Sequence, residues 1–126
     1  MRTHKDLTVW QKSISFVTDI YKATKSFPKE ELFGLTSQMR RAAISIPSNI
    51  AEGHGRHSKK ELVRFLSISL GSASELETQL IISKNLDFIS EDESNQLLSC
   101  NEEIIKMLVS LIKYNNNGKL EIDNAT

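Results

Sequence analysis

The chain has 126 residues, of which 39% are hydrophobic and 25% charged, and its 16 basic residues balance its 16 acidic ones. These values fit one soluble globular domain that folds without support from a disulfide or a metal. The zero net charge excludes a protein whose whole surface is basic, so any nucleic-acid binding must come from a local cluster.

Apolar residues recur at steps of three and four along four segments, as they do in amphipathic helices. The first segment runs from about Leu7 to Lys25 and ends before Pro28, because a proline pushes the preceding residue out of the α region. The second segment begins after Gly34 and ends near Gly53. One face of the first helix is formed by Leu7, Trp10, Ile14, Val17 and Tyr21, and one face of the second by Leu35, Met39, Ala43, Ile46 and Ile50.

The third and fourth segments both open on the S-x-x-E spacing of a capping box, in which a serine oxygen accepts a free amide of the first helical turn. Ser58 to Glu61 starts the third helix, which ends near Asn85, and Ser90 to Glu93 starts the fourth, which ends near Tyr114. The apolar face of the third helix is formed by Leu62, Phe65, Leu66, Ser69, Ala73, Leu76 and Leu80, and that of the fourth by Leu97, Leu98, Ile104, Ile105, Leu108, Leu111 and Ile112.

Four helices with short connections predict an all-α fold, an antiparallel up-and-down four-helix bundle. Residues 1–114 would form its single domain. Residues 115–126 lack an apolar face and are predicted to form a disordered C-terminal tail.

Pro47 falls inside the second helix. A proline there removes the amide that would bond the carbonyl of Ala43, and its ring crowds that carbonyl. Ile46 and Ile50 nevertheless continue the apolar stripe on both sides of the proline. We therefore predict that the second helix stays continuous and is kinked at Pro47.

Small residues are concentrated in the second and third helices, and Gly71 lies in the middle of the third. A glycine inside a helix costs about 1 kcal/mol relative to alanine, which a small face offsets by letting another helix approach closely. That partner is either within the chain or in another subunit. The apolar stripes of the second and fourth helices are wider than one bundle core needs, and this favours a homo-oligomer.

The sequence offers little for catalysis. His54, His57 and Glu61 are the nearest approach to a metal site, but such a site takes three or four ligands, and no C-x-x-C, H-E-x-x-H or Glu-x-x-His pattern accompanies them. The stretch GHGRHSKK is not a nucleotide-binding loop, because it matches neither G-x-G-x-x-G nor G-x-x-x-x-G-K-[ST]. We therefore predict a protein that is not an enzyme, with no catalytic, metal or cofactor site and no small-molecule substrate.

One cysteine, Cys100, cannot form a disulfide within the chain, and this predicts a cytoplasmic protein. The apolar flank of Cys100 favours a packed thiol over a reactive one. The first residues lack the apolar core of a secretion signal, and no apolar run approaches the roughly 20 residues of a membrane span. We expect no membrane partner.

The charge is unevenly distributed in the middle of the chain. Between Arg40 and Arg64 the sequence has six basic residues and only two acidic ones. The amides at the start of the third helix also favour anions, so this stretch is the candidate surface for RNA or DNA phosphates. Aromatic residues for base stacking are missing, and binding would therefore read backbone or shape. In the alternative interpretation these side chains are solvated or paired with acidic neighbours, and no nucleic acid binds. The candidates are Arg40, Arg41, Arg56, Lys59, Lys60 and Arg64.

Three stretches, DLTVWQKS, FPKEELFGLTSQMRRAAISIPSNIAEGHGRHSKKELVRFL and GSASELETQL, resemble the family of 23S ribosomal RNA intervening-sequence proteins, also called the S23 ribosomal protein family. The resemblance covers about residues 6–114, and its most specific part is FGLTSQMRRAAISIPSNIAEG. The family motif falls here on Gly34, Gln38, Arg40, Arg41, Ser45, Pro47, Asn49, Glu52 and Gly53.

This resemblance implies a small up-and-down bundle that assembles with copies of itself into a pentameric ring with a central channel. Some family members are encoded within insertions in bacterial 23S ribosomal RNA genes, and a related branch comprises accessory proteins of diversity-generating retroelements, which the resemblance links to nucleic-acid binding through a basic surface. No enzymatic activity is established for the family. The motif residues are expected to bridge subunits or to hold the second helix against the third.

The implied partners are therefore other copies of the chain and RNA or DNA. The zero net charge departs from the more basic members of the family. A purely structural or protein-binding module, with no nucleic acid, stays the alternative.

Overall fold

The computed structural model describes residues 3–116, and four long helices account for most of them. α1 spans Thr8–Thr24, α2 Leu35–His54, α3 Lys59–Asn85 and α4 Glu91–Asn115. Two short 3-10 turns, η1 at His4–Asp6 and η2 at Lys29–Glu31, precede α1 and α2. No strand occurs in the described range, which confirms the predicted all-α fold.

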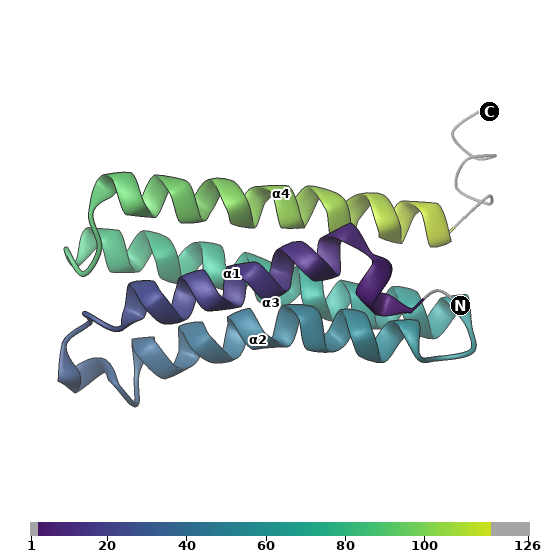
Figure 1. Ribbon diagram of the computed structural model, residues 1–126, viewed down its shortest axis with the longest axis horizontal. Coiled ribbons are helices and arrows are strands. Elements are labelled where there is room, and N and C mark those ends of the chain that lie inside the picture. The colour runs from purple at the N-terminus through teal and green to yellow at the C-terminus, as the bar shows by residue number, and fades with distance from the viewer. Residues whose placement is uncertain (1–2, 117–126) are drawn as a thin grey trace.

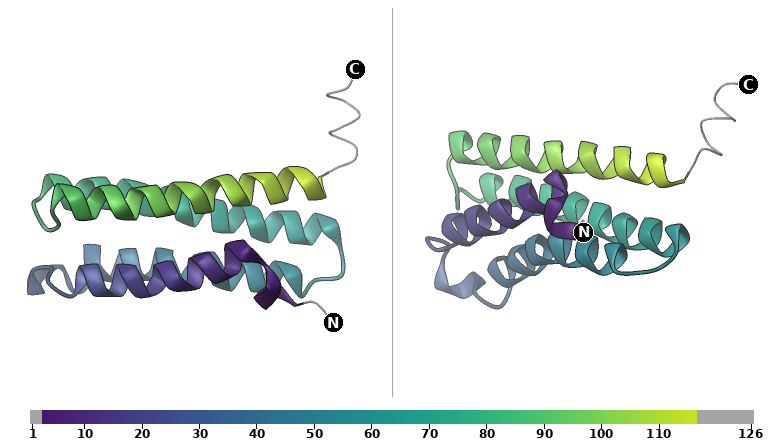
Figure 2. Two further views of the ribbon diagram at one scale, coloured as in Figure 1. Left: turned by 45° about the horizontal axis from the view of Figure 1, so that its top comes forward. Right: turned by 45° about the vertical axis from the view of Figure 1, so that its right-hand side comes forward.

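The helices run alternately up and down along one long axis (Figure 1). Each helix packs against the next one in sequence, and α1 also packs against α4, so the four helices close into a bundle (Figure 2). The predicted antiparallel up-and-down four-helix bundle is therefore confirmed. The turn between α2 and α3 lies at the end of the bundle opposite the loop between α1 and α2.

Serine caps begin the last two helices, as the sequence predicts, but within the described residues neither glutamate carboxylate accepts the serine amide that would complete a capping box. The Ser58 Oγ accepts the amide of Glu61 at 3.1 Å, and the Ser90 Oγ accepts the amide of Glu93 at 3.1 Å. Each bond satisfies one of the amides that the first turn leaves free. The sequence thus located both helix starts from purely local chemistry.

The core follows the axis of the bundle and receives apolar side chains from all four helices. In α2 the predicted face is the buried one, because Met39, Ala43, Ile46 and Ile50 are almost fully enclosed. The largest fully buried apolar side chains are Phe16, Ile20, Met39, Ile46, Ile50, Leu66, Leu76, Leu80, Ile104 and Leu108.

In α1 the bundle buries a different face from the one that the sequence singles out. Phe16 and Ile20 reach the core, whereas Ile14 keeps 42% of its surface exposed. The buried face is interrupted by Ser13, whose Oγ donates to the carbonyl of Trp10 at 2.9 Å. α1 is therefore apolar on two neighbouring faces, and the bundle fully covers only one of them.

α2 continues through Pro47, which is buried. This continuity confirms one half of the prediction for that residue, since two separate helices would have contradicted it. The kink itself stays a prediction.

At the C-terminal end, α4 reaches Asn115 and is capped at Asn116. The rest of the predicted tail, residues 117–126, lies outside the described residues. The assignment of residues 1–114 to one domain stays a prediction.

Candidate interaction surfaces

Small residues allow α2 and α3 to pack in direct contact. The Ser69 Oγ donates to the carbonyl of Ile46 at 2.9 Å, and the Ser72 Oγ lies 2.8 Å from the Ser45 Oγ. At the end of the contact, a Cβ added to Gly53 would come within 2.8 Å of the Phe65 Cβ. Real Cβ atoms do not approach so closely, so this position requires glycine.

The other motif residues lie along the same helix. Gly34 is the residue before the first turn of α2. The Asn49 Nδ2 donates to the Ser45 carbonyl at 2.8 Å and to its Oγ at 2.9 Å. Glu52 forms an ion pair, and Gln38 is exposed beside a hollow between α2 and α3. Most of the motif therefore shapes α2 and its contact with α3.

Arg40 and Arg41 are adjacent but have different surroundings. The Arg40 Nε donates to the Thr24 Oγ1 at 2.9 Å, and its guanidinium lies 4.5 Å from the centre of the Tyr21 ring. Arg40 thus fastens α2 to α1. Arg41 is exposed on the outer side of α2.

The remaining four candidates lie at the other end of the bundle, at the turn between α2 and α3 and in the first turns of α3. We call Arg56, Lys59, Lys60 and Arg64 the basic end cluster. Arg56 pairs with Glu52 at 2.9 Å, and Arg64 pairs with Glu61 at 3.4 Å. Lys59 and Lys60 are exposed and have no ion pair within the described residues.

The six basic candidates do not form one patch. Arg41 lies in the second turn of α2, about 20 Å at 1.5 Å per residue from the last residue of that helix, His54, and Arg56 follows in the turn beyond it. Proximity in sequence was misleading here because a long helix runs between the two groups.

The histidines do not converge with Glu61. The His54 ring lies 6.4 Å from the His4 ring, and His4 stacks edge-on against Trp10 at 5.2 Å. In the described part of the chain, no three His, Cys, Asp or Glu side chains come close enough together to hold a metal ion.

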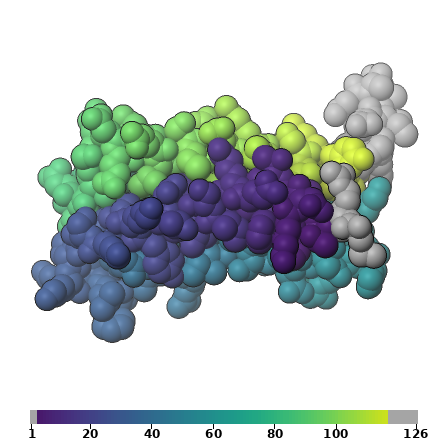
Figure 3. Space-filling model, viewed as in Figure 1, coloured from purple at the N-terminus to yellow at the C-terminus, as the bar shows by residue number. Residues whose placement is uncertain are grey.

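Next to the α2–α3 contact, a broad apolar surface lies along the groove between α1 and α2. Two hollows of about 500 and 410 Å³ follow this groove and share Ile44. Phe33, at the edge of one hollow, is 93% exposed. Figure 3 shows the side of the molecule on which α1 lies between α2 and α4. The surface is here called the α1–α2 face, and the buried Pro47 also lines one of its hollows. Its exposed and half-buried side chains are Trp10, Ile14, Val17, Tyr21, Phe33 and Ile44.

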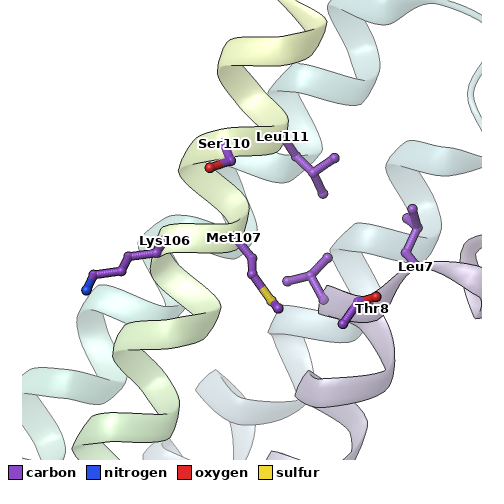
Figure 4. A pocket seen from close by; sticks show the side chains of 7 residues that line it. Leu7, Thr8, Lys106, Met107, Ser110 and Leu111 are labelled. Carbon is purple, nitrogen blue, oxygen red and sulfur yellow. The ribbon is translucent and has the colours of Figure 1, made fainter.

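A third hollow, of about 410 Å³, lies between the start of α1 and the C-terminal half of α4. Leu7, Met107 and Leu111 point into it, whereas Lys106 points away (Figure 4). Lys106 instead pairs with Glu102 at 3.5 Å. Thr8 and Ser110 also line this hollow, and the other side chains that line it are mostly apolar.

Among the described helices, none is long and apolar enough to cross a membrane. Several polar side chains inside the bundle, such as Ser69 and Asn101, donate to backbone carbonyls of a neighbouring helix. The protein is a four-helix bundle whose exposed features include the apolar α1–α2 face and the basic end cluster.

The family model of the 23S rRNA-intervening sequence protein matches residues 5–110, and the chain belongs to this family. A crystal structure of a protein of unknown function from the S23 ribosomal protein family of Bacteroides thetaiotaomicron resembles this chain with a TM-score of 0.77 and 28% sequence identity. The likeness covers 84% of this chain and 99% of that chain. No curated protein matches the sequence. The resemblance seen in the sequence is thereby confirmed.

Proposed function

We propose that this protein is a non-enzymatic scaffold that assembles with copies of itself into a closed ring. The α1–α2 face carries this proposal, because a side chain as large as Phe33 is 93% exposed there beside further apolar residues. Contiguous exposed apolar surface on a soluble protein marks an interaction site. The family resemblance supports a pentamer as the size of the ring.

Light scattering or native mass spectrometry tests this assembly directly. We expect the mass of a pentamer of 14.2 kDa chains at micromolar concentration. A monomer mass that does not change as the concentration is raised would rule out self-association. A stable oligomer of another size would contradict the pentamer but would agree with a scaffold that assembles with copies of itself.

We further propose that the ring binds RNA or DNA phosphates at the basic end cluster. A cyclic assembly presents the same end of every copy on one side, so clusters that are weak alone act together. Lys59 and Lys60 are central to this proposal, because they are exposed and unpaired within the described residues. The single cysteine fits a cytoplasmic setting for such a complex.

Retention of mixed RNA and DNA at low salt tests this binding. Lys59→Ala with Lys60→Ala should weaken retention and reduce the salt slope by about 0.7 to 0.9 for each phosphate that is no longer neutralised. Lys22→Ala with Lys25→Ala is the matched control, since it removes the same charge from exposed positions at the opposite end. Equal effects of the two double variants would contradict a site at the basic end cluster.

A protein-binding module without nucleic acid is the second candidate function. It is favoured by the two ion pairs, Arg56 with Glu52 and Arg64 with Glu61, which partly neutralise the basic end cluster. In that case the wild-type protein would form its ring and retain neither RNA nor DNA at low salt.

A further inference from the structure

We propose that neighbouring copies pack head to tail, with the α1–α2 face of one copy against the outer flank of α3 of the next. The α3 flank is defined here by Ile68, Gly71, Glu75 and Ile82. This inference rests on the proposed self-association and adds the two surfaces that make the contact.

The α3 flank carries an exposed apolar side chain at each of its two ends. Ile68, Glu75 and Ile82 follow each other at seven-residue steps and therefore share one side of the helix. Both isoleucines are exposed, Ile82 by 42%. A Cβ added to Gly71 would meet no atom within 4 Å. Packing within the chain thus gives no reason for a glycine at this position, whereas Gly53 is enclosed by Phe65 and Leu62.

The two surfaces are complementary in charge. The hollows of the α1–α2 face are lined by Arg40, Arg41 and His4 and by no carboxylate. The α3 flank carries Glu75 between its two isoleucines, and that carboxylate accepts only a long bond of 3.5 Å, from Gln79, within the described residues. Arg41 and Glu75 line a shared hollow in one chain without forming an ion pair there.

A large side chain projects from one surface, and the other surface is open at its middle. Phe33 projects from one end of the α1–α2 face, where it is almost fully exposed. Gly71 leaves the middle of the α3 flank without a side chain, so a bulky group of a neighbour meets no obstruction there. Aromatic anchors of this kind dominate the energy of many protein interfaces.

A head-to-tail contact also accounts for both surfaces at once. A symmetric contact between two identical faces would cover one surface and leave the other exposed. A contact between two different surfaces covers both in every copy, and it closes into a ring when the rotation permits. The arrangement therefore follows from one molecule having two unlike apolar surfaces.

Two single substitutions at exposed positions test the pairing. Ile44→Glu places a charge in the α1–α2 face, and Ile82→Arg places one on the α3 flank. Ile81→Arg is the matched control, because Ile81 is 45% exposed, as open as Ile82, but points about 100° away around the same helix. Circular dichroism checks that each variant folds, and native mass spectrometry gives its mass.

We expect Ile44→Glu and Ile82→Arg each to abolish the wild-type oligomer, and Ile81→Arg to keep it. Mixing the first two variants should then restore a single contact and yield a one-to-one dimer, because each retains the surface that the other has disrupted. Loss of the oligomer in Ile44→Glu but not in Ile82→Arg would overturn the pairing in favour of a contact between two α1–α2 faces.

The same experiment separates this pairing from the proposed function. If the wild-type protein is an oligomer and both variants keep its mass, the pairing is wrong while self-association stands. If the wild-type protein is a monomer at every concentration, the proposed function and the pairing fail together.

Discussion

The two sides of α2 differ in how completely their apolar residues are covered. Toward α3, Ser45 and Gly53 bring the helices into direct contact, and the hollow beside Gln38 is lined mostly by polar side chains. Toward α1, Ile44 stays 43% exposed beside two hollows. Small residues thus let the backbones of α2 and α3 approach closely, whereas a large apolar side chain elsewhere on α2 stays partly exposed.

The largest expected difference between the two sides is in folding stability. Ile50→Ala removes a fully buried side chain from the core and should cost about 2–5 kcal/mol. Ile44→Ala should change the free energy of unfolding by about 0.5 kcal/mol or less. Urea unfolding followed by Trp10 fluorescence measures both, at a concentration where light scattering gives the monomer mass. Similar losses would contradict the distinction between a covered and an open side.

Gly53 and Gly71 should respond in opposite ways to the addition of a methyl group. Gly53→Ala forces a Cβ against Phe65 and should destabilise the chain by about 1–3 kcal/mol through overpacking. Gly71→Ala meets no atom and should stabilise it by about 0.5–1 kcal/mol through better helix propensity. Thermal unfolding of the two variants beside the wild type, at a concentration where light scattering gives the monomer mass, measures both effects. A stabilised Gly53→Ala would show that α2 and α3 are not in tight contact.

The neighbouring residues Arg40 and Arg41 should differ less in how much their replacement lowers the free energy of unfolding. Arg40→Ala loses a hydrogen bond to Thr24 and the stacking on Tyr21, and should cost about 1–2 kcal/mol. Arg41→Ala should be within about 0.5 kcal/mol of wild type, because its side chain is exposed. Both values come from the same urea titration. A larger effect at Arg41 than at Arg40 would reverse these structural roles.

The smallest expected effect is on the reactivity of a thiol, that of Cys100, on the side of the bundle where α1 meets α4. Burial raises the pKa of the Cys100 thiol above its ordinary value, so the thiol stays protonated at neutral pH. Because the thiolate is the nucleophile, iodoacetamide should label native Cys100 more slowly than the urea-unfolded chain. The raised pKa also means that its contribution to stability is present at low pH and is lost as the pH rises through the folded-state pKa. Equal labelling rates in the two states would contradict this burial.

Local chemistry made most of the fold predictable. Ser58 and Ser90 begin helices because their side chains accept amides three residues on, and the spacing from Met39 to Ile50 located the buried face of α2. The buried face of α1 was not predictable in this way. Two neighbouring stripes are apolar there, and the positions of α2 and α4 decide which one is covered.

The candidate sites were harder to predict because they depend on distant parts of the chain. Arg40 is tied to Thr24, which lies on another helix, so its structural role has no local signal. Asn101 is polar, and polar residues are expected at the surface. Its side chain is nevertheless buried, and its Nδ2 donates to the Ala73 carbonyl at 2.8 Å inside the core. In the sequence Phe33 is one apolar residue before Gly34, and its exposure becomes visible only in the folded bundle.

The mass of the native protein, measured beside that of Ile44→Glu, tests the proposed assembly. We expect a ring of several 14.2 kDa chains for the wild type and a folded monomer for the variant. A wild-type protein that stays monomeric at all concentrations would contradict it.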